Sequence, residues 1–129
     1  PERRFASFLE SHAEHIDWWY KNGDSGKQHY SIPYTNNANE KALFYVDFVV
    51  RMKNGQVFLF DTKTEGSDAE APNKHNALID YVNSEENKKL GLKGGIIIQK
   101  GDNWVYSKLP INNTSDLTNW DSFYPDQYK

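Results

Sequence analysis

Hydrophobic positions recur along this chain with two different periods, and each period predicts a different kind of element. Residues 2–20 carry apolar and aromatic side chains at spacings of three and four: Phe5, Phe8, Leu9, His12, Ala13, Ile16, Trp19 and Tyr20. This spacing puts them on one face of a helix, so residues 2–20 are predicted to form an amphipathic helix. Glu2 falls at the edge of the buried face, unlike the other acids of the segment, Glu10, Glu14 and Asp17.

Two residues of this predicted helix leave alternatives open. Glu2 is either an acid directed at the body of the domain or a first-turn residue that suits the helix dipole. Trp18 falls on the polar face, so either the helix ends near Asp17 or Trp18 packs against something outside the apolar stripe. An exposed Trp could stack on a nucleic-acid base, although a core or interdomain contact is the commoner use.

The strongest hairpin signal lies in residues 43–66, where two runs rich in Val and Phe flank Asn54-Gly55. The Asn-Gly dipeptide is typical of tight hairpins because both residues tolerate positive φ. Both runs carry apolar side chains on both faces. Their strands are therefore predicted to lie in the middle of a sheet that is covered on each side, which is α/β architecture.

The remaining elements are shorter and follow in chain order. They are a turn at 22–27, an edge strand at 28–34 that stops at Pro33, a loop at 35–40, a helix at 72–89, a buried strand at 96–98, an edge strand at 103–108, and a packed, irregular tail from 110 onward. Lys74 lies at the centre of the apolar face of the second predicted helix. A Lys in that place must extend to solvent, pair with an acid or point into a site.

Composition restricts the possible functions of the chain more than it restricts the possible folds. The chain has 129 residues, enough for one domain with a real core, and its 37% hydrophobic and 26% charged residues are typical of a globular protein. Because it contains no cysteine, disulfide frameworks and thiolate metal sites are excluded, and a cytoplasmic location is the default expectation. No apolar run is long enough to span a membrane, so no membrane partner is expected.

The net charge and the first residue bear on partners. The formal net charge of -3 does not provide the basic field of an autonomous nucleic-acid binder, so metal ions and neighbouring domains would have to supply much of the attraction to DNA. The chain begins at Pro1 and enters a helical pattern at once. We therefore expect residues 1–129 to be a single domain cut from a longer polypeptide.

Three charged residues interrupt the hairpin: Asp47 in the first arm, and Asp61 and Lys63 at the end of the second. Buried charges are costly unless they are paired or bind a metal, and paired carboxylates suit Mg²⁺. Lys63 emerges on the same face as Asp61, where it could contact both a water on the metal and a phosphate. The pattern favours metal-assisted phosphodiester hydrolysis, with Lys63 orienting the nucleophile or steadying the developing charge.

Two further ligands complete this hypothesis, and one structural alternative competes with it. Glu2 would add a carboxylate from the first helix, and the backbone carbonyl of Thr62 is a further candidate ligand. In the alternative, Asp47, Asp61 and Lys63 form only a buried salt-bridge cluster in a structural α/β module.

A site shared by Asp47, Asp61 and Lys63 requires a particular register between the two strands. With a strict two-residue turn at Asn54-Gly55, Asp47 would lie opposite Thr62, while Asp61 and Lys63 would face the other side of the sheet. A three-residue loop or a bulge would instead bring Asp47 opposite Asp61 or Lys63. We predict that offset.

At these residues the chain resembles the PD-(D/E)xK nucleases, which have the restriction-endonuclease-like fold. Val46-Asp47 stands where the family has Pro-Asp, and Asp61-Thr62-Lys63 stands for (D/E)xK, with Asp61 in place of the commoner Glu. Segments 2–9, 18–22, 31–34, 44–50 and 61–66 resemble the C-terminal nuclease domain of type III restriction enzyme Res subunits. The resemblance covers roughly residues 2–81, and the strand at 96–98 fits the last core strand.

This resemblance implies a three-layer fold with a central mixed sheet flanked by helices, in the order αβββαβ. It implies a Mg²⁺-dependent endodeoxyribonuclease, in which Mn²⁺ can substitute, acting on double-stranded DNA. Asp47, Asp61, Lys63 and Glu2 would be catalytic, and Lys74 would contact a DNA phosphate. The expected partners are a helicase or translocase domain upstream in the same chain and a methyltransferase or specificity subunit. The alternative is a catalytically silent domain of the same fold that binds DNA or a protein.

Overall fold

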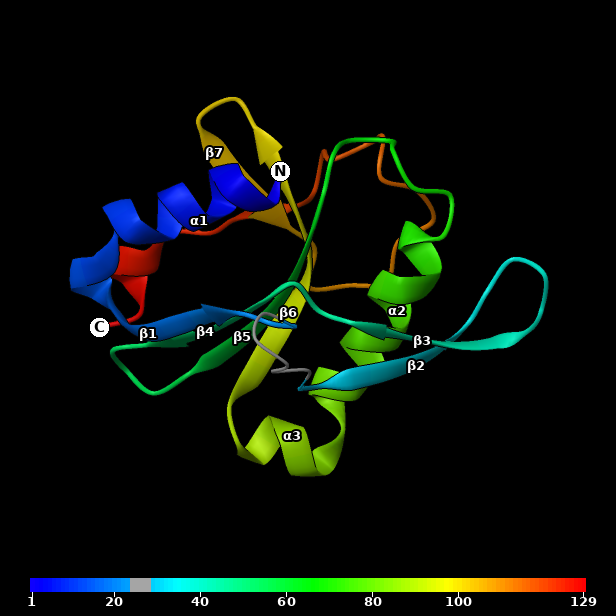
Figure 1. Cartoon of the computed structure of the whole chain (residues 1–129), viewed down its shortest axis with the longest axis horizontal. Helices are drawn as coiled ribbons and strands as arrows, with labels where there is room; N and C mark the ends of the chain where they lie inside the picture. The colour runs from blue at the N-terminus through cyan, green and yellow to red at the C-terminus, as the bar shows by residue number, and fades with distance from the viewer. Residues whose placement is uncertain (24–28) are drawn as a thin grey trace.

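A mixed β-sheet runs through the centre of the protein (Figure 1). The computed structural model describes residues 1–23 and 29–129, and in these residues the sheet has six strands in the order β1-β4-β5-β6-β7-β8. The strands are β1 (Ile16–Lys21), β4 (Phe48–Met52), β5 (Val57–Lys63), β6 (Leu92–Lys100), β7 (Asn103–Tyr106) and β8 (Asp121–Ser122). Strands β5 and β6 are parallel, and the other neighbouring pairs are antiparallel.

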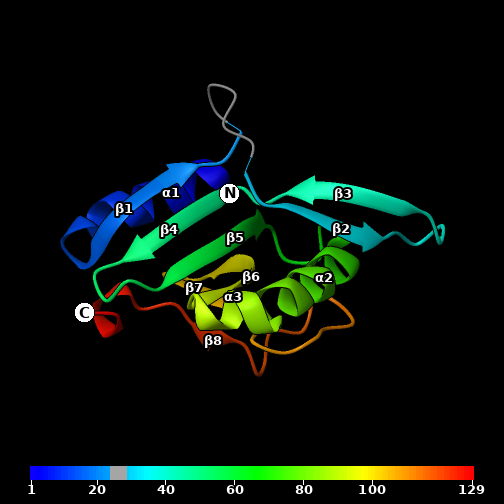
Figure 2. The same ribbon diagram turned by 90° about the horizontal axis from the view of Figure 1, so that it is seen from below.

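Helices cover both faces of this sheet (Figures 1 and 2). Helix α1 (Glu2–Ser11) packs on one face, and α2 (Ala71–Asn83), followed by the short α3 (Glu85–Lys89), packs on the other. A separate hairpin of β2 (Ser31–Thr35) and β3 (Lys41–Tyr45) extends beside α2. Two 3₁₀ turns, Ala13–His15 and Pro125–Gln127, complete the described elements. The predicted α/β class with a central mixed sheet is confirmed.

The two faces of the sheet bury different side chains. On the α1 face, Phe5 packs edge-on against Phe48, Phe60 and Trp104, with ring centroids 5.1, 5.7 and 4.9 Å away. On the α2 face the core is mainly aliphatic and joins the main sheet to α2 and the β2–β3 hairpin: Ile32, Phe44, Val46, Val49, Leu59, Leu78, Val82 and Leu92. Strands β4 and β5 are therefore covered on both sides, as expected for central strands. The start of the first predicted arm is not, because Leu43 and Tyr45 belong to β3 and are exposed.

The helix predicted at 2–20 is wrong beyond Ser11, because Ile16–Lys21 forms β1. β1 pairs with β4, and the register shifts between Ile16 and Trp18. This irregularity puts both Ile16 and Trp19 on the α1 face, although an unbroken strand would send residues three apart to opposite faces. The bulge thus reproduces a helical spacing within a strand. Trp18 stays 43% exposed and stacks on Tyr20 at 5.7 Å.

Three other boundaries differ from the predictions. The helix expected at 72–89 is interrupted at Ser84, whose ψ of 151° ends α2 and whose hydroxyl accepts the Asn87 N–H of α3. The first hairpin arm is split into β3 and β4, because the chain leaves the β2–β3 hairpin at residues 46–47 to enter the main sheet. The edge strand does not stop at Pro33: β2 includes it, paired only with β3. Most of the turn expected at 22–27 lies outside the described residues.

The strand expected at 96–98 is the centre of the longer β6. Gly94 allows this strand to pack closely, because a Cβ at that position would lie 2.0 Å from the Leu59 carbonyl oxygen. The strand expected near 103–108 forms as β7, with Trp104 and Tyr106 both in the α1-face core. It is not the edge strand that was predicted, because the short β8 from the tail pairs along its outer side. The tail is irregular but packed, and it buries Phe123 among the aromatic rings.

The predicted register of the hairpin is confirmed. β4 pairs with β5 through Phe48↔Phe60 and Arg51↔Val57, and the same offset carried one residue beyond the ladder would bring position 47 opposite position 61. A three-residue loop produces this offset: the Met52 N–H donates to the Gln56 carbonyl at 2.8 Å, and Gly55 takes a φ of +93°. The two-residue turn, which would have separated Asp47 from Asp61, does not form.

Candidate functional site

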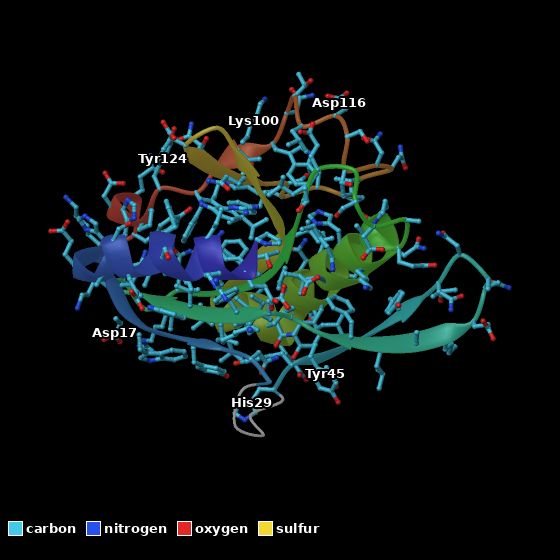
Figure 3. All side chains as sticks on the ribbon, turned by 45° about the horizontal axis from the view of Figure 1, so that its top comes forward. Asp17, His29, Tyr45, Lys100, Asp116 and Tyr124 are labelled. Atoms are coloured by element: carbon cyan, nitrogen blue, oxygen red, sulfur yellow. The ribbon has the colours of Figure 1, made fainter. Side chains whose placement is uncertain are left out.

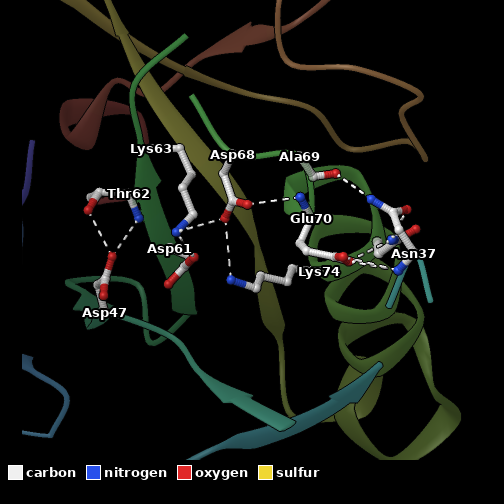
Figure 4. A network of polar contacts seen from close by, with 10 residues as sticks. Asn37, Asp47, Asp61, Thr62, Lys63, Asp68, Ala69, Glu70 and Lys74 are labelled. Carbon is white, nitrogen blue, oxygen red and sulfur yellow. Dashed lines mark hydrogen bonds and ion pairs between the residues drawn. The ribbon is translucent and has the colours of Figure 1, made fainter. Parts of the chain in front are cut away.

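The charged residues of the hairpin meet at the C-terminal end of β5, where β4 begins and the loop to α2 departs (Figure 4). Every second residue of β5 points to the same face of the sheet. Asp61 and Lys63 therefore share the α2 face with Leu59. The Lys63 Nζ lies 3.4 Å from the Asp61 Oδ2. Asp61 is only 4% exposed, so this carboxylate is buried as deeply as the apolar core around it.

Burial makes Asp61 an unusually weak acid. Its pKa is raised from 3.8 to about 7, first by desolvation and then by the negative charge of Asp47, while Lys63 and Lys74 partly offset both effects. A carboxyl group that titrates near neutral pH can exchange a proton, or give it up to a cation, under physiological conditions. The positive charges near the end of β5 are thus too few to keep the pKa of Asp61 at its ordinary value.

Asp47 is held by the strand next to it. Its Oδ2 accepts the Thr62 N–H at 2.9 Å and the Thr62 hydroxyl at 2.8 Å, and its own carbonyl accepts the Asn22 N–H at 2.7 Å. The β4–β5 ladder ends at Phe48 and Phe60, so the Asp47 side chain takes the place that the next ladder hydrogen bond would occupy. These bonds hold Asp47 near Asp61, with the Asp47 carboxylate directed toward Thr62.

The orientation of Thr62 bears on its predicted role as a carbonyl ligand. In a strand, the N–H and C=O of one residue point to the same side. Because the Thr62 N–H donates to Asp47, the Thr62 carbonyl is also directed to the Asp47 side of β5. The Thr62 carbonyl and the Asp47 carboxylate therefore lie on the same side of β5, while the Asp61 side chain lies on the α2 face.

Lys63 connects Asp61 to another acid, Asp68, in the loop between β5 and α2. Its Nζ lies 3.4 Å from the Asp68 Oδ2, and the Nζ of Lys74 lies 3.3 Å from the same oxygen. Burial opposes the charge of Lys63, but Asp61, Asp68 and Asp47 outweigh it and raise its pKa above the ordinary value. Lys63 is therefore protonated and positively charged at neutral pH.

The predicted basic residue on the second helix, Lys74, faces this cluster. Besides its pair with Asp68, its Nζ lies 5.9 Å from the ring centroid of Tyr34 and 6.0 Å from that of Phe44, so the ammonium group lies over two rings of the β2–β3 hairpin. Among the alternatives expected for a Lys on the apolar face, it pairs with an acid beside the site.

Glu2, the predicted acid of α1, lies beside Asp47 rather than Asp61. Its pKa is raised by burial and then by the charge of Asp47, and its Oε1 lies 3.8 Å from the Lys21 Nζ. Glu2 and Asp47 also line a hollow of about 280 Å³ at the surface. The other residues that line it are Pro1, Thr62, Lys63, Thr64 and Ser67.

The donors at the end of β5 are few, and all of them are oxygens. Among the described residues, no three His, Cys, Asp or Glu side chains converge on one point as metal ligands. Mg²⁺, however, is commonly held by one or two carboxylates together with water and substrate phosphate. Asp47 and Asp61 supply such a pair, and the raised pKa of Asp61 is the mark of a carboxylate that a cation would relieve. The ligand chemistry of Asp47 and Asp61, two carboxylates at adjoining strand ends, suits Mg²⁺, and Glu2 lies beside Asp47.

Sequence reasoning missed two residues near the site. Asp68 was not singled out, because no spacing rule places the segment between β5 and α2 over Lys63. The buried His75 on α2 was not singled out: its Nδ1 accepts the Ile96 N–H at 3.0 Å, and its Nε2 lies 3.0 Å from the Leu109 carbonyl. Desolvation lowers the pKa of His75 to about 4, so it is a neutral bridge between α2, β6 and the tail.

Comparisons with models of known families, with curated proteins and with solved structures returned no match to this chain. None of the helices in residues 1–23 and 29–129 combines the length and apolar character needed to span a membrane. A second hollow of about 320 Å³ lies between α2, α3 and β6, lined partly by Ile79, Val82 and Leu92. Its charged lining residues are lysines, Lys88, Lys93 and Lys108, so it has no carboxylate ligand for a metal.

Proposed function

We propose that this chain is a divalent-metal-dependent DNA endonuclease domain with a restriction-endonuclease-like fold, working as part of a larger type III restriction or helicase-nuclease assembly. The core elements α1, β1, β4, β5, α2 and β6 follow the order αβββαβ, with the β2–β3 hairpin inserted after the first strand. This order agrees with the fold expected from the resemblance. It supports the proposal at the level of architecture.

The observation that carries the proposal is the buried Asp61 carboxylate, which is 4% exposed and has a pKa of about 7, beside Asp47 and Lys63. Three acids, Asp47, Asp61 and Asp68, accompany two lysines in this cluster, and the surplus negative charge raises the cost of burying Asp61. A divalent cation held by Asp47 and Asp61 would offset that cost by supplying positive charge. Asp47, Asp61 and the Thr62 carbonyl are the proposed ligands, and Glu2 is the added acid.

The protonation states assign roles to the other side chains. Lys63 is positively charged, so it acts as a hydrogen-bond donor that orients the attacking water and steadies negative charge on the phosphorus centre, and not as a general base. Lys74 is proposed to hold an adjacent DNA phosphate. When bound, Mg²⁺ would supply charge neutralisation for the phosphodiester and acidify a coordinated water.

A second candidate, a silent module that binds DNA or protein, rests on exposed aromatic residues. The rings of Trp18 and Tyr20, both on β1, stack on each other. Tyr45, at the end of β3, is 42% exposed (Figure 3). Exposed rings of this kind can stack on bases or anchor a protein contact. This alternative predicts DNA binding that neither needs a divalent metal nor leads to cleavage.

A cleavage assay separates the two candidates. Supercoiled and linear DNA are incubated with the domain, alone and in its parent polypeptide, with Mg²⁺ or Mn²⁺. We expect nicking or cutting that falls roughly a hundredfold or more in Asp61→Asn and Lys63→Met. The matched control is Asp80→Asn, which removes one negative charge at an exposed position of α2 and should retain parental activity. Metal-independent binding without cleavage in all variants would support the silent module instead.

A further inference from the structure

Asp68 occupies a position that no step of the proposed hydrolysis requires. Its Oδ2 receives two ammonium groups, the Lys63 Nζ at 3.4 Å and the Lys74 Nζ at 3.3 Å (Figure 4). The side chains of Lys63, Lys74 and Asp68 are only 22%, 19% and 25% exposed. Two partly desolvated cations that converge on one anionic oxygen make a site whose geometry also suits a phosphate oxygen.

The two oxygens of Asp68 have separate partners. Oδ1 accepts the Glu70 N–H at 2.8 Å within the turn that precedes α2, while Oδ2 faces the lysines. The surrounding backbone is held independently of the lysines: Gly66 donates to the Thr114 carbonyl at 3.2 Å, and the Glu70 carboxylate accepts the Asn37 N–H. Displacing Asp68 from the lysines therefore needs a side-chain rotation rather than a loop movement.

We infer that Lys63 and Lys74 form a phosphate subsite that Asp68 keeps closed, its carboxylate standing where a phosphodiester oxygen of the substrate binds. This inference rests on the proposed function for the identity of the substrate. Under that function both lysines contact phosphates, yet both are paired with Asp68 in the free protein. A DNA phosphate must compete with Asp68 for the two cations, so Asp68 weakens binding of any phosphodiester that does not also engage the metal and its ligands.

Other charges around the subsite act in the same direction. Asp61 lies 3.4 Å from the Lys63 Nζ on the side away from solvent, so a phosphate at Lys63 meets this carboxylate as well. Removing Asp68 leaves Asp61 in place and does not create an unopposed cationic patch. The expected gain in phosphate affinity is therefore moderate, and it must be measured against a control of equal charge.

The test uses Asp68→Asn, in which the side-chain carbonyl still accepts the Glu70 N–H but no longer carries the charge. Binding of a short fluorescein-labelled DNA duplex is measured in metal-free buffer at low ionic strength, and inorganic phosphate is titrated by NMR. We expect Asp68→Asn to bind the duplex about tenfold more tightly than the parent, and the control Asp80→Asn to change binding by about twofold or less. Adding Lys74→Met to Asp68→Asn should return the affinity to the parental value.

Two outcomes would overturn the inference: equal affinities for Asp68→Asn and Asp80→Asn, or a gain in Asp68→Asn that survives Lys74→Met. Denaturant unfolding checks that the variants fold, and Asp68→Ser, whose hydroxyl can accept the same N–H, is a second route if Asn disturbs the turn. The proposed function fails separately. Tighter binding by Asp68→Asn without cleavage by the parent would refute only the nuclease, and cleavage without tighter binding would refute only the closed subsite.

Discussion

Strand β5 buries two opposite kinds of side chain within four positions. Phe58 and Phe60 face α1, are fully buried and pack against each other and against Phe123 with ring centroids 5.0–5.1 Å apart. Asp61 is almost as deeply buried on the α2 face, but it is a carboxylate in a place that lacks enough positive charge. Equal burial therefore stabilises one face of the strand and costs stability at the end of the other.

This difference separates the part of the sheet that specifies the fold from the part that carries the chemistry. The aromatic cluster fixes β5 between β4 and β6, and thereby holds the charged residues at one end of the sheet. The charged end contributes little to stability and lowers it where Asp61 is ionised. Substitutions on the two faces of β5 should therefore shift stability in opposite directions.

The largest effect is expected on the aromatic face. Phe60→Ala should lower the free energy of unfolding by about 3–5 kcal/mol, because it removes a fully buried ring and leaves a cavity among aromatic neighbours. Chemical denaturation measures the change. The control is Tyr124→Ala, which truncates a ring that is 44% exposed (Figure 3) and should cost about 1 kcal/mol or less. Similar losses in the two variants would refute the assignment of this cluster as the core.

On the charged end, Asp61→Asn should stabilise the protein at neutral and alkaline pH. The pKa of Asp61 is about 7 in the folded state, against 3.8 for an unperturbed Asp carboxyl group, so between these values the folded state keeps a proton that the unfolded state has lost. Stability falls as pH rises through this window, and the penalty is complete above it.

Without metal, we expect Asp61→Asn to exceed the parent by roughly 2–4 kcal/mol at about pH 8, and to match it near about pH 4. Denaturant unfolding across this pH range measures the difference, with Asp80→Asn as the control of equal charge. A difference that stays constant with pH would contradict the buried, uncompensated state of Asp61.

A smaller effect is expected where the two regions meet, at Thr62. Thr62→Val keeps the side-chain volume and the backbone bond to Asp47 but removes the hydroxyl bond to the Asp47 Oδ2. We expect a loss of about 1–2 kcal/mol, measured by denaturant unfolding. The matched control is Thr118→Val, which removes an exposed hydroxyl bond to Asp116 and should change stability by less than about 0.5 kcal/mol. Equal effects would mean that burial adds nothing to the Thr62 bond.

The smallest effect is expected for an exposed ion pair on the same sheet. The Arg51 Nε lies 3.2 Å from the Asp17 Oδ2, closer than Lys63 is to Asp61, but both side chains are nearly half exposed. Solvent screening should keep the loss in Arg51→Ala below about 0.5 kcal/mol in a thermal or denaturant melt. A loss well above about 1 kcal/mol would show that distance, rather than burial, decides the strength of these pairs.

The local patterns predicted the centre of the molecule better than its edges. The three-residue loop and the register of β4 and β5 followed from requiring Asp47 and Asp61 to share one site, and both strands are central as predicted. The extent of the first helix could not be predicted, because a bulge at Ile16 and Trp18 gave a strand the spacing of a helix. Only pairing with β4 distinguishes the two structures.

The candidate site was predictable where it lies on strands and not where it lies on loops. Alternation along β5 placed Asp61 and Lys63 together, and helical spacing placed Lys74 toward them. Asp68 could not be found in this way, because the position of its loop depends on contacts with Thr114 and Asn37, far away in sequence. Its ion pairs arise from tertiary structure alone.

Calorimetric titration with Mg²⁺ or Mn²⁺ tests the central claim most directly. The parent and Asp61→Asn are compared at the same pH, with Asp80→Asn as the control of equal charge. We predict that the parent and Asp80→Asn bind the metal and gain thermal stability from it, while Asp61→Asn loses both responses. Failure of the parent to bind at millimolar metal, or equal binding by Asp61→Asn, would contradict a metal-dependent nuclease site at the end of β5.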